Sequence, residues 1–332
     1  MDQDQGAQES VVTVACVNFT PIWGDTAATL VKMQANIREA ASQGADIVVF
    51  PEGALQGPCS CSACADAGGP CPHHLAMAET VPGPSSTAIA SLAAEHDLYV
   101  VFGLPERDQD DPGRLYNAAA VVGPEGILGT YRKVHLGTLP WVTEGITYTP
   151  GTSLPVFPTR FGLVGVQICY DFWFNPELTR LLALKGARLI LNPVGSFSAP
   201  GRAESMRTTA LSRAQENLVY VAVSNVVGGP GVHSAGYAGE QLTEALRPDR
   251  YVGHSMIAGP AFPRFGQLYT EAGDMEEIVC ASLSLQRLDR FDSVFNYRSW
   301  RADRLASASQ LVADEFSLLA EQSATLAAPT VL

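Results

Sequence analysis

The chain has 332 residues, of which 46% are hydrophobic and 17% are charged, so it can bury a sizeable core in one large domain or two ordinary ones. Its formal net charge of −13 argues against a nucleic-acid partner, because phosphate contacts require a basic surface. No apolar stretch reaches the roughly 20 residues that a membrane-spanning helix needs. These features predict a globular enzyme without a nucleic-acid or membrane partner.

The first ten residues are polar and acidic, and they have neither the basic nor the apolar region of a signal peptide. We therefore expect residues 1–10 to be a disordered tail and the protein to be cytoplasmic. The chain has seven cysteines, and an odd number in a reducing compartment indicates thiols rather than a disulfide framework.

Hydrophobic periodicity and turn residues divide the chain into alternating strands and helices. In chain order, the first half predicts a strand at Val11–Asn18, a helix at Asp25–Gln43, a strand at Ile47–Phe50, a helix at Ser85–His96, and strands at Leu98–Leu104, Tyr116–Val122 and Ile127–Arg132. The second half predicts a strand at Leu163–Ile168, a helix at Pro176–Lys185, a strand at Leu189–Leu191, a helix at Glu204–Asn217, and strands at Leu218–Ser224, Gly253–Ile257 and Ile278–Leu285. This order is typical of an α/β layered fold with helices outside a mixed sheet.

The C-terminal segment Ala302–Leu332 is rich in alanine and leucine, which predicts a helix followed by a loose tail. Two interpretations remain open for it. It is either an arm that packs on another subunit or a frayed terminus.

Four of the seven cysteines crowd into one segment, together with two histidines: Cys59, Cys61, Cys64, Cys71, His73 and His74. Thiolates and imidazoles suit zinc, but the spacing is not a common paired Cys-x-x-Cys arrangement. A flexible loop with adventitious cysteines, a metal site and a local disulfide therefore all remain open. The segment is also a candidate lid over an active site.

Three polar side chains stand at the ends of short apolar strands. Glu52 follows Ile47–Phe50, Lys133 follows Ile127–Arg132, and Cys169 follows Leu163–Ile168. A thiolate attacks acyl and nitrile carbon, a partly buried carboxylate can take and return its proton, and an ammonium can hold the oxyanion. Each residue alone is more often structural, whereas the three together predict an acyl-transfer site without histidine. Two interpretations remain open for His135. It lies two residues after Lys133 and so on the same side of a strand, or it is a structural hydrogen-bonding residue.

The chain resembles the nitrilase superfamily of carbon–nitrogen hydrolases from about Val11 to Arg301. The motifs that carry the resemblance are Val49-Phe50-Pro51-Glu52, Tyr131-Arg132-Lys133-Val134-His135-Leu136, Ile168-Cys169-Tyr170-Asp171, Leu191-Asn192-Pro193, Arg213-Ala214-Gln215-Glu216-Asn217 and Gly253-His254-Ser255-Met256-Ile257. The resemblance implies a four-layer α-β-β-α sandwich over residues 11–301, a homodimer or larger homo-oligomer, and no metal or organic cofactor. Residues 302–332 would then form the arm.

The resemblance also implies roles for individual residues. Glu52 would be the general base and acid, Cys169 the acylated nucleophile, and Lys133 with the backbone N–H of Tyr170 the oxyanion hole. Glu144 matches a second glutamate that positions substrate in amidase-like members. We also expect the side chains of Tyr170, Trp173 and Asn192 to position substrate.

The residues after Cys169 favour particular branches of the family. Tyr170-Asp171 resembles amidase and carbamoylase branches rather than typical nitrilases. The N-carbamoyl-D-amino-acid hydrolases carry an arginine pair soon after the cysteine, but this chain has Phe172 and Trp173 there. Arg202 or Arg207 is a candidate to replace that clamp on a substrate carboxylate. Together with Trp173, Trp141 suggests a pocket lined by aromatic side chains.

The predicted function is hydrolysis of a linear, non-peptide amide through a Cys169 thioester, which releases a carboxylic acid and ammonia or an amine. Two alternatives use the same site on N-carbamoyl compounds or on nitriles. Two others belong to different classes: a scaffold protein with an inactive hydrolase fold, and assembly regulated by metal binding to the cysteine-rich segment.

Overall fold

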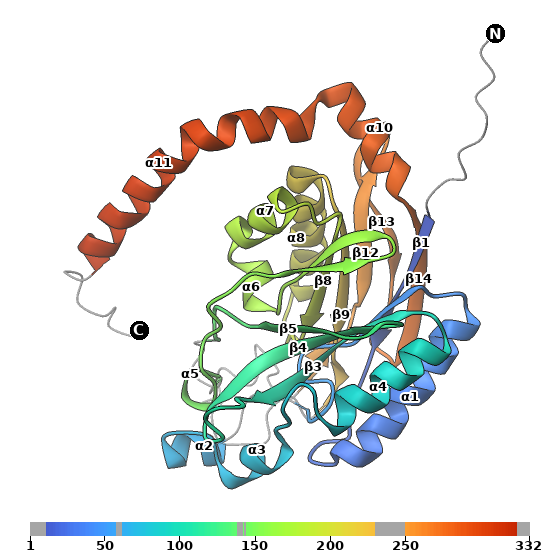
Figure 1. Ribbon diagram of the computed structural model, residues 1–332, viewed down its shortest axis with the longest axis vertical. Coiled ribbons are helices and arrows are strands. Elements are labelled where there is room, and N and C mark those ends of the chain that lie inside the picture. Colours follow the sequence, from blue (N-terminus) through green and yellow to red (C-terminus); the bar gives the residue numbers. More distant parts are fainter. Residues whose placement is uncertain (1–10, 58–61, 138–141, 143, 230–249, 324–332) are drawn as a thin grey trace.

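The computed structural model describes residues 11–57, 62–137, 142, 144–229 and 250–323 (Figure 1). The predicted tail at residues 1–10, Cys59, Cys61 and Trp141 lie outside the described residues. Two six-stranded sheets form the centre of the molecule.

The first sheet has the order β14-β1-β2-β3-β4-β5. Its strands are β14 (Glu277–Ser284), β1 (Val11–Asn18), β2 (Ile47–Val49), β3 (Tyr99–Arg107), β4 (Leu115–Gly123) and β5 (Gly126–Arg132). β1, β2 and β3 are parallel, and the remaining pairs are antiparallel. The carboxyl ends of β2 and β5 therefore lie at the same edge of the sheet, as does the amino end of β4.

The second sheet has the order β13-β12-β9-β8-β7-β6. Its strands are β13 (Arg264–Glu271), β12 (Met256–Ala261), β9 (Tyr220–Asn225), β8 (Leu189–Val194), β7 (Gly162–Val166) and β6 (Val156–Thr159). β7, β8 and β9 are parallel. A separate two-stranded sheet pairs β10 (Val227–Gly228) with β11 (Tyr251–Val252). In the sequence, β10 follows β9 and β11 precedes β12.

Helices cover the outer face of each sheet (Figure 1). α1 (Thr26–Ser42) and α4 (Pro84–Glu95) lie on the first sheet, and α7 (Pro176–Leu184) and α8 (Arg202–Asn217) lie on the second. Side chains alternate along β1: Val14 packs in the core shared with the second sheet, whereas Ala15 packs in the core that α1 and α4 cover. This arrangement confirms the predicted α-β-β-α sandwich.

Several elements differ from the sequence prediction. The edge strands β6 and β13 and the helix α10 (Leu285–Phe295) were not predicted. β6 contains Pro158, and β13 is largely half-exposed, so neither has the continuous apolar pattern of a buried strand. The cysteine-rich segment contains two short helices, α2 (Ser62–Ala67) and α3 (Pro72–Met77), in addition to its loop.

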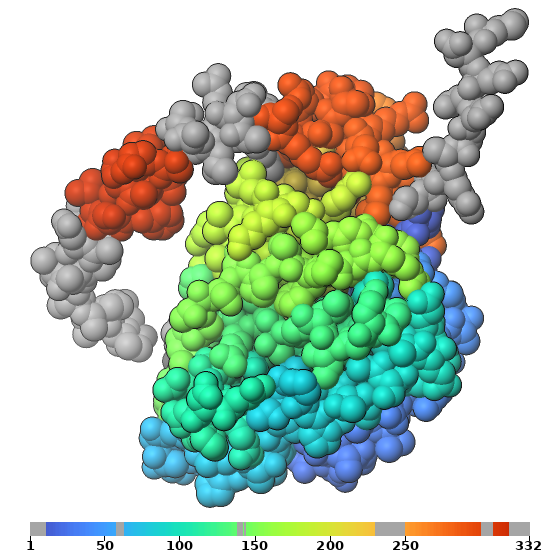
Figure 2. All heavy atoms as spheres, in the orientation of Figure 1, coloured from blue at the N-terminus to red at the C-terminus, as the bar shows by residue number. Residues whose placement is uncertain are grey.

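The C-terminal helix α11 begins earlier than predicted and spans Tyr297–Ser323. Its first turn is held by Tyr297, whose hydroxyl donates to the carbonyl of Glu216 at 2.8 Å. The rest of the helix extends away from the sandwich (Figure 1), and the atoms of residues 308–318 stand apart from the body (Figure 2). None of the helices in the described part of the chain is long and apolar enough to cross a membrane.

Candidate active site

Glu52, Lys133 and Glu144 form a buried ion cluster at the carboxyl edge of the first sheet. Lys133 Nζ lies 2.7 Å from Glu52 Oε1 and 2.8 Å from each carboxylate oxygen of Glu144. Lys133 is 1% exposed, and both carboxylates are buried. Glu52 follows β2, Lys133 follows β5, and Glu144 begins the short helix α5 (Glu144–Thr147). The structure thus brings together the two predicted catalytic residues of this sheet and the predicted positioning glutamate.

Asn117 completes this cluster and was not predicted from the sequence. Its amide donates to Glu52 Oε1 at 2.8 Å and to Glu144 Oε1 at 2.5 Å. Backbone N–H groups donate to the other carboxylate oxygens, from Gly195 to Glu52 and from Gly137 to Glu144. The available signal was a polar residue within the otherwise apolar buried strand β4, because such a residue needs a hydrogen-bond partner.

Burial raises the pKa of Glu144. Loss of water is the main cause, the ammonium of Lys133 opposes it, and the neighbouring charge of Glu52 raises the pKa further. The two carboxylates share one lysine, so protonation of one changes the electrostatic environment of the other.

Cys169 stands at the turn between β7 and the short helix α6 (Tyr170–Trp173). Its φ is +47° and its ψ is −101°, a conformation that non-glycine residues rarely adopt. The Cys169 N–H donates to the carbonyl of Pro193 at 3.1 Å and to Asn192 Oδ1 at 3.2 Å. Asn192, expected to position substrate, therefore holds the backbone of Cys169.

Burial is also the main reason that the pKa of the Cys169 thiol is raised well above its usual value. The negative charge of Glu52 raises it further, and Lys133 lowers it by less than the other groups raise it. The charge of Lys133 by itself favours the thiolate, but burial outweighs it. A thiol in this environment needs a base that takes its proton as it attacks.

Asp171 connects the two sheets next to the site. One oxygen, Oδ2, accepts from the hydroxyl of Tyr131 at 2.6 Å and from the N–H of Val134 at 3.2 Å. The other, Oδ1, accepts from the N–H of His135 at 2.8 Å and lies 2.9 Å from His135 Nδ1. His135 is thus bonded to this carboxylate, which fits the structural interpretation of that histidine rather than a catalytic one.

The aromatic residues after Cys169 lie around the site. The ring of Tyr170 is 5.6 Å from Lys133 Nζ. The indole of Trp173 is buried against Phe172, and its Nε1 has no hydrogen-bond partner among the described residues.

The two candidate arginines differ in their surroundings. The guanidinium of Arg202 lies 5.3 Å from the ring of Trp173, and its Nε donates to Ser196 Oγ at 2.6 Å. Its positive charge favours the ionised form of Cys169. Arg207 instead pairs with Glu271 at 2.7 Å. Of the two, Arg202 is the one without an acidic partner among the described residues.

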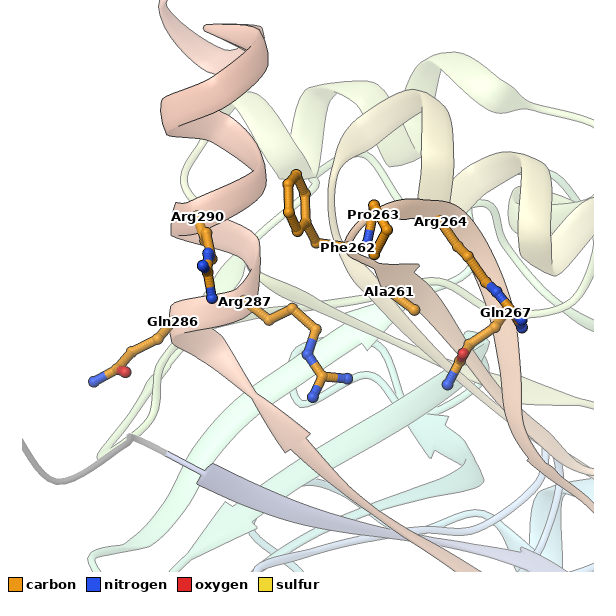
Figure 3. Close-up of a pocket in the computed structure, with 8 residues that line it drawn as sticks. All are labelled: Ala261, Phe262, Pro263, Arg264, Gln267, Gln286, Arg287 and Arg290. Carbon is orange, nitrogen blue, oxygen red and sulfur yellow. The ribbon is translucent and has the colours of Figure 1, made fainter.

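A separate cavity of about 450 Å³ lies between the turn after β12 and α10 (Figure 3). Its lining includes Arg264, Arg287 and Arg290. Because β12 runs antiparallel to β9, this cavity lies at the amino end of β9, whereas Cys169 lies at the carboxyl end of the sheet. The cavity is therefore not part of the Cys169 site.

A four-layer sandwich with a thiol coupled to a buried carboxylate–lysine cluster is the arrangement expected of a carbon–nitrogen hydrolase. Residues 13–292 match the family model described as carbon-nitrogen hydrolase, and the chain belongs to this family, the nitrilase superfamily.

Two relatives are known as omega-amidases. Omega-amidase NIT2 of Homo sapiens is 33% identical over 264 residues, which cover 76% of this chain and 81% of that protein. Omega-amidase NIT2-B of Xenopus laevis is 31% identical over 282 residues, which cover 82% of this chain and 89% of that protein. The predicted enzyme class, an amide carbon–nitrogen hydrolase, is confirmed.

Solved structures have the same fold. Nit3 of Saccharomyces cerevisiae, a member of branch 10 of the nitrilase superfamily, superposes with a TM-score of 0.68 at 26% identity, covering 86% of this chain and 94% of that one. A carbon-nitrogen hydrolase from Helicobacter pylori G27 gives a TM-score of 0.70 at 21% identity, covering 87% and 94%.

Proposed function

We propose that the protein hydrolyses a linear amide through a thioester on Cys169, with Glu52 as the proton-transfer group. The observation that carries the proposal is the position of Glu52, which is held by Lys133, Asn117 and the N–H of Gly195 and acts electrostatically on the Cys169 thiol. Because that thiol is protonated at rest, a fixed carboxylate must remove its proton. The omega-amidase relatives support an amide as the substrate.

Acylation begins when the sulfur of Cys169 attacks the amide carbon and Glu52 takes the thiol proton. The carbonyl oxygen becomes an oxyanion, which Lys133 and the backbone N–H of Tyr170 stabilise. As the C–N bond breaks, Glu52 gives the proton to the leaving nitrogen, and ammonia or an amine departs. A thioester remains on Cys169.

Deacylation uses the same groups in a second cycle. Glu52 takes a proton from water as the water oxygen attacks the thioester carbon. The C–S bond then breaks, the carboxylic acid leaves, and the proton returns to the sulfur of Cys169. Throughout both steps Glu144 keeps Lys133 oriented toward the reacting oxygen, a role that its two 2.8 Å contacts support.

The mechanism is tested by intact-protein mass spectrometry with a panel of amides, ureides and nitriles. We expect a mass increase on Cys169 with an amide, no adduct and no turnover in Cys169→Ala, and wild-type turnover in the control Cys280→Ser. Glu52→Gln should lose acylation. Turnover by Cys169→Ala, or an adduct that forms at the wild-type rate in Glu52→Gln, contradicts the assignment. Release of carbon dioxide with ammonia would instead identify a carbamoylase.

We further infer that the substrate carries a carboxylate, which Arg202 binds. Arg202 is half-buried and has no acidic partner among the described residues. Burial lowers its pKa, so a carboxylate ligand would restore a favourable environment for the charge. Arg202→Gln should raise KM for an amide with a distal carboxylate by about 10- to 100-fold, the equivalent of one charge-assisted hydrogen bond, and leave a neutral amide unaffected. Equal losses with both substrates would contradict this role.

We also infer that the protein is a homo-oligomer in which α11 packs on a second copy. At 100° per residue, the exposed side chains of Leu311, Val312, Phe316 and Leu318 lie on one side of this helix. An exposed apolar face on a helix that leaves the body favours a partner surface. Light scattering should show a smaller assembly for Phe316→Glu and the wild-type assembly for Ser317→Glu on the opposite face. A wild-type mass for Phe316→Glu would contradict the inference.

A cytoplasmic location stays a prediction. Cys16, Cys169 and Cys280 are free thiols, which supports a reducing compartment.

A further inference from the structure

A buried group of two thiols and one imidazole lies outside the hydrolase site. Cys64 is in α2, and Cys71 immediately precedes α3, which contains His74. Cys64 Sγ lies 3.3 Å from His74 Nδ1, and Cys71 Sγ lies 3.4 Å from the same nitrogen. The three side chains are 0%, 1% and 0% exposed, respectively. All three donor atoms lie within 4.8 Å of one another.

The local sequence explains why these atoms meet. Gly68 has a φ of +62° and turns the chain after α2, so that the N–H of Cys71 returns to donate to Cys64 Sγ at 3.4 Å. Cys71 is the N-cap of α3, and His74 is its third helical residue. The side chains at these two positions of a helix face each other, as they do in a capping box. The pair thus works as a preformed chelate.

We propose that Cys64, Cys71 and His74 bind a structural zinc ion through Sγ, Sγ and Nδ1. With Zn–S near 2.3 Å and Zn–N near 2.0 Å, tetrahedral angles place sulfur and nitrogen about 3.5 Å apart. The two observed sulfur–nitrogen distances, 3.3 and 3.4 Å, are slightly shorter, so small side-chain shifts admit the ion. On binding, both thiols release their protons to solvent, and a fourth donor completes the tetrahedron.

A two-centre hydrogen bond accounts for one of the two sulfur–nitrogen contacts but not for both. One ring nitrogen carries either one hydrogen or one lone pair, yet two sulfur atoms approach the same nitrogen at nearly equal distances. A cation between them makes all three contacts favourable. The N–H of Cys71, which points to the sulfur of Cys64, also favours the thiolate form that a metal requires.

The zinc ion would fix one wall of the hydrolase site without entering the chemistry. The ring of His74 packs edge-on against Tyr148 at 6.2 Å. The Tyr148 N–H donates to the carbonyl of Glu144 at 2.8 Å, and Glu144 begins α5. α2 also contacts α5. Loss of the metal is therefore expected to loosen the helix that carries Glu144.

The first test measures metal in the full-length wild-type chain. The protein is purified with a thiol reductant, loaded with zinc chloride and dialysed. Elemental mass spectrometry should then find about one zinc ion per chain. Loading with cobalt chloride should give the near-ultraviolet charge-transfer band of a cobalt–thiolate bond. Zinc content below about a tenth of an equivalent, or a Cys64–Cys71 disulfide with no bound metal, overturns the proposal.

Variants then assign the ligands. Cys64→Ser, Cys71→Ser and His74→Ala should each lower bound zinc at least about tenfold, whereas His73→Ala and Cys280→Ser should retain it. If a ligand variant fails to fold, iodoacetamide mapping of wild-type protein decides. Zinc should slow labelling of Cys64 and Cys71, a chelator should reverse that effect, and Cys280 should not respond. Labelling of Cys64 and Cys71 at the same rate with and without zinc contradicts the site.

Discussion

Tyr131 donates its hydroxyl hydrogen to Asp171 at 2.6 Å, and this bond is one of several that join the two sheets beside the active site. Tyr131 is two residues before Lys133, and Asp171 is two residues after Cys169. Burial, with the charge of Asp171 as a second cause, raises the pKa of Tyr131, so the phenol remains the donor. The distance between the lysine and the thiol therefore depends on a group that touches neither substrate nor the reacting atoms.

Tyr131→Phe should lower kcat by about 10-fold or more, since hydrogen bonds to a charged group contribute about 1.5–3 kcal/mol. KM should change little, because the variant misplaces the catalytic groups rather than removing a substrate contact. Tyr99→Phe is the matched control, since Tyr99 donates to Glu125 at 3.0 Å on the same sheet. An equal loss in both variants would indicate a general effect on stability instead.

Asn117→Leu should lower kcat/KM by roughly 100-fold, because it removes donors from two buried carboxylates at once and each such loss costs about 1–3 kcal/mol. Asn117→Asp should be worse, since it adds a third negative charge beside Glu52 and Glu144. Asn36→Leu changes an amide that donates to the carbonyl of Lys32 within α1 and should leave turnover unchanged. Wild-type kcat/KM in Asn117→Leu would show that the amide is dispensable.

The raised pKa of Cys169 predicts how the free enzyme reacts with iodoacetamide. An ordinary thiol reaches its maximum rate once the pH exceeds its pKa of about 8.5. Cys169 should instead react slowly at neutral pH, and its rate should keep rising through about pH 9.5 without a plateau. Stopped-flow labelling with peptide mapping measures this profile. A plateau at or below about pH 8 would mean that Cys169 is a resting thiolate.

His135 predicts a pH-dependent contribution to stability. Its hydrogen bond with Asp171 raises the pKa of His135 above the unfolded value of about 6.5. The folded state then binds the proton more tightly, so this contribution is full below the unfolded pKa and is lost as the pH rises through the folded pKa. The side chain is 41% exposed, and solvent screening limits the contribution to about 0.5 kcal/mol.

Urea unfolding of wild-type protein and His135→Gln tests this linkage. The difference in free energy of unfolding should be larger near pH 5.5 than near pH 8.5. The same difference at both pH values, or a larger one at the higher pH, would contradict the assigned ion pair.

Two kinds of feature could be predicted from the sequence. They are the buried strands with continuous apolar patterns, and the polar residues at the ends of those strands. Glu52, Lys133 and Cys169 were predicted as site residues because each follows such a strand. Asn117 was missed because its role depends on β4 lying between β3 and β5, and no local pattern encodes that neighbourhood. The same limit applies to Cys64 and His74, which are ten residues apart and meet only through the turn at Gly68. Edge strands such as β6 were missed because they have a neighbouring strand on one side alone. Their sequences therefore lack the continuous apolar run of a buried strand.

The cluster of two carboxylates and one ammonium has a further consequence for turnover. With all three groups ionised, its formal charge is −1. In the proposed mechanism, hydrolysis creates a new carboxylate beside this cluster. Like charges at short range in a buried site repel strongly, so the cluster that assists bond cleavage also expels the acid that it has made. The amide group that is cleaved is neutral and enters without this penalty. Departure of the product is thus driven by the same ionic arrangement that performs the chemistry, and the acid should be a poor inhibitor of its own formation.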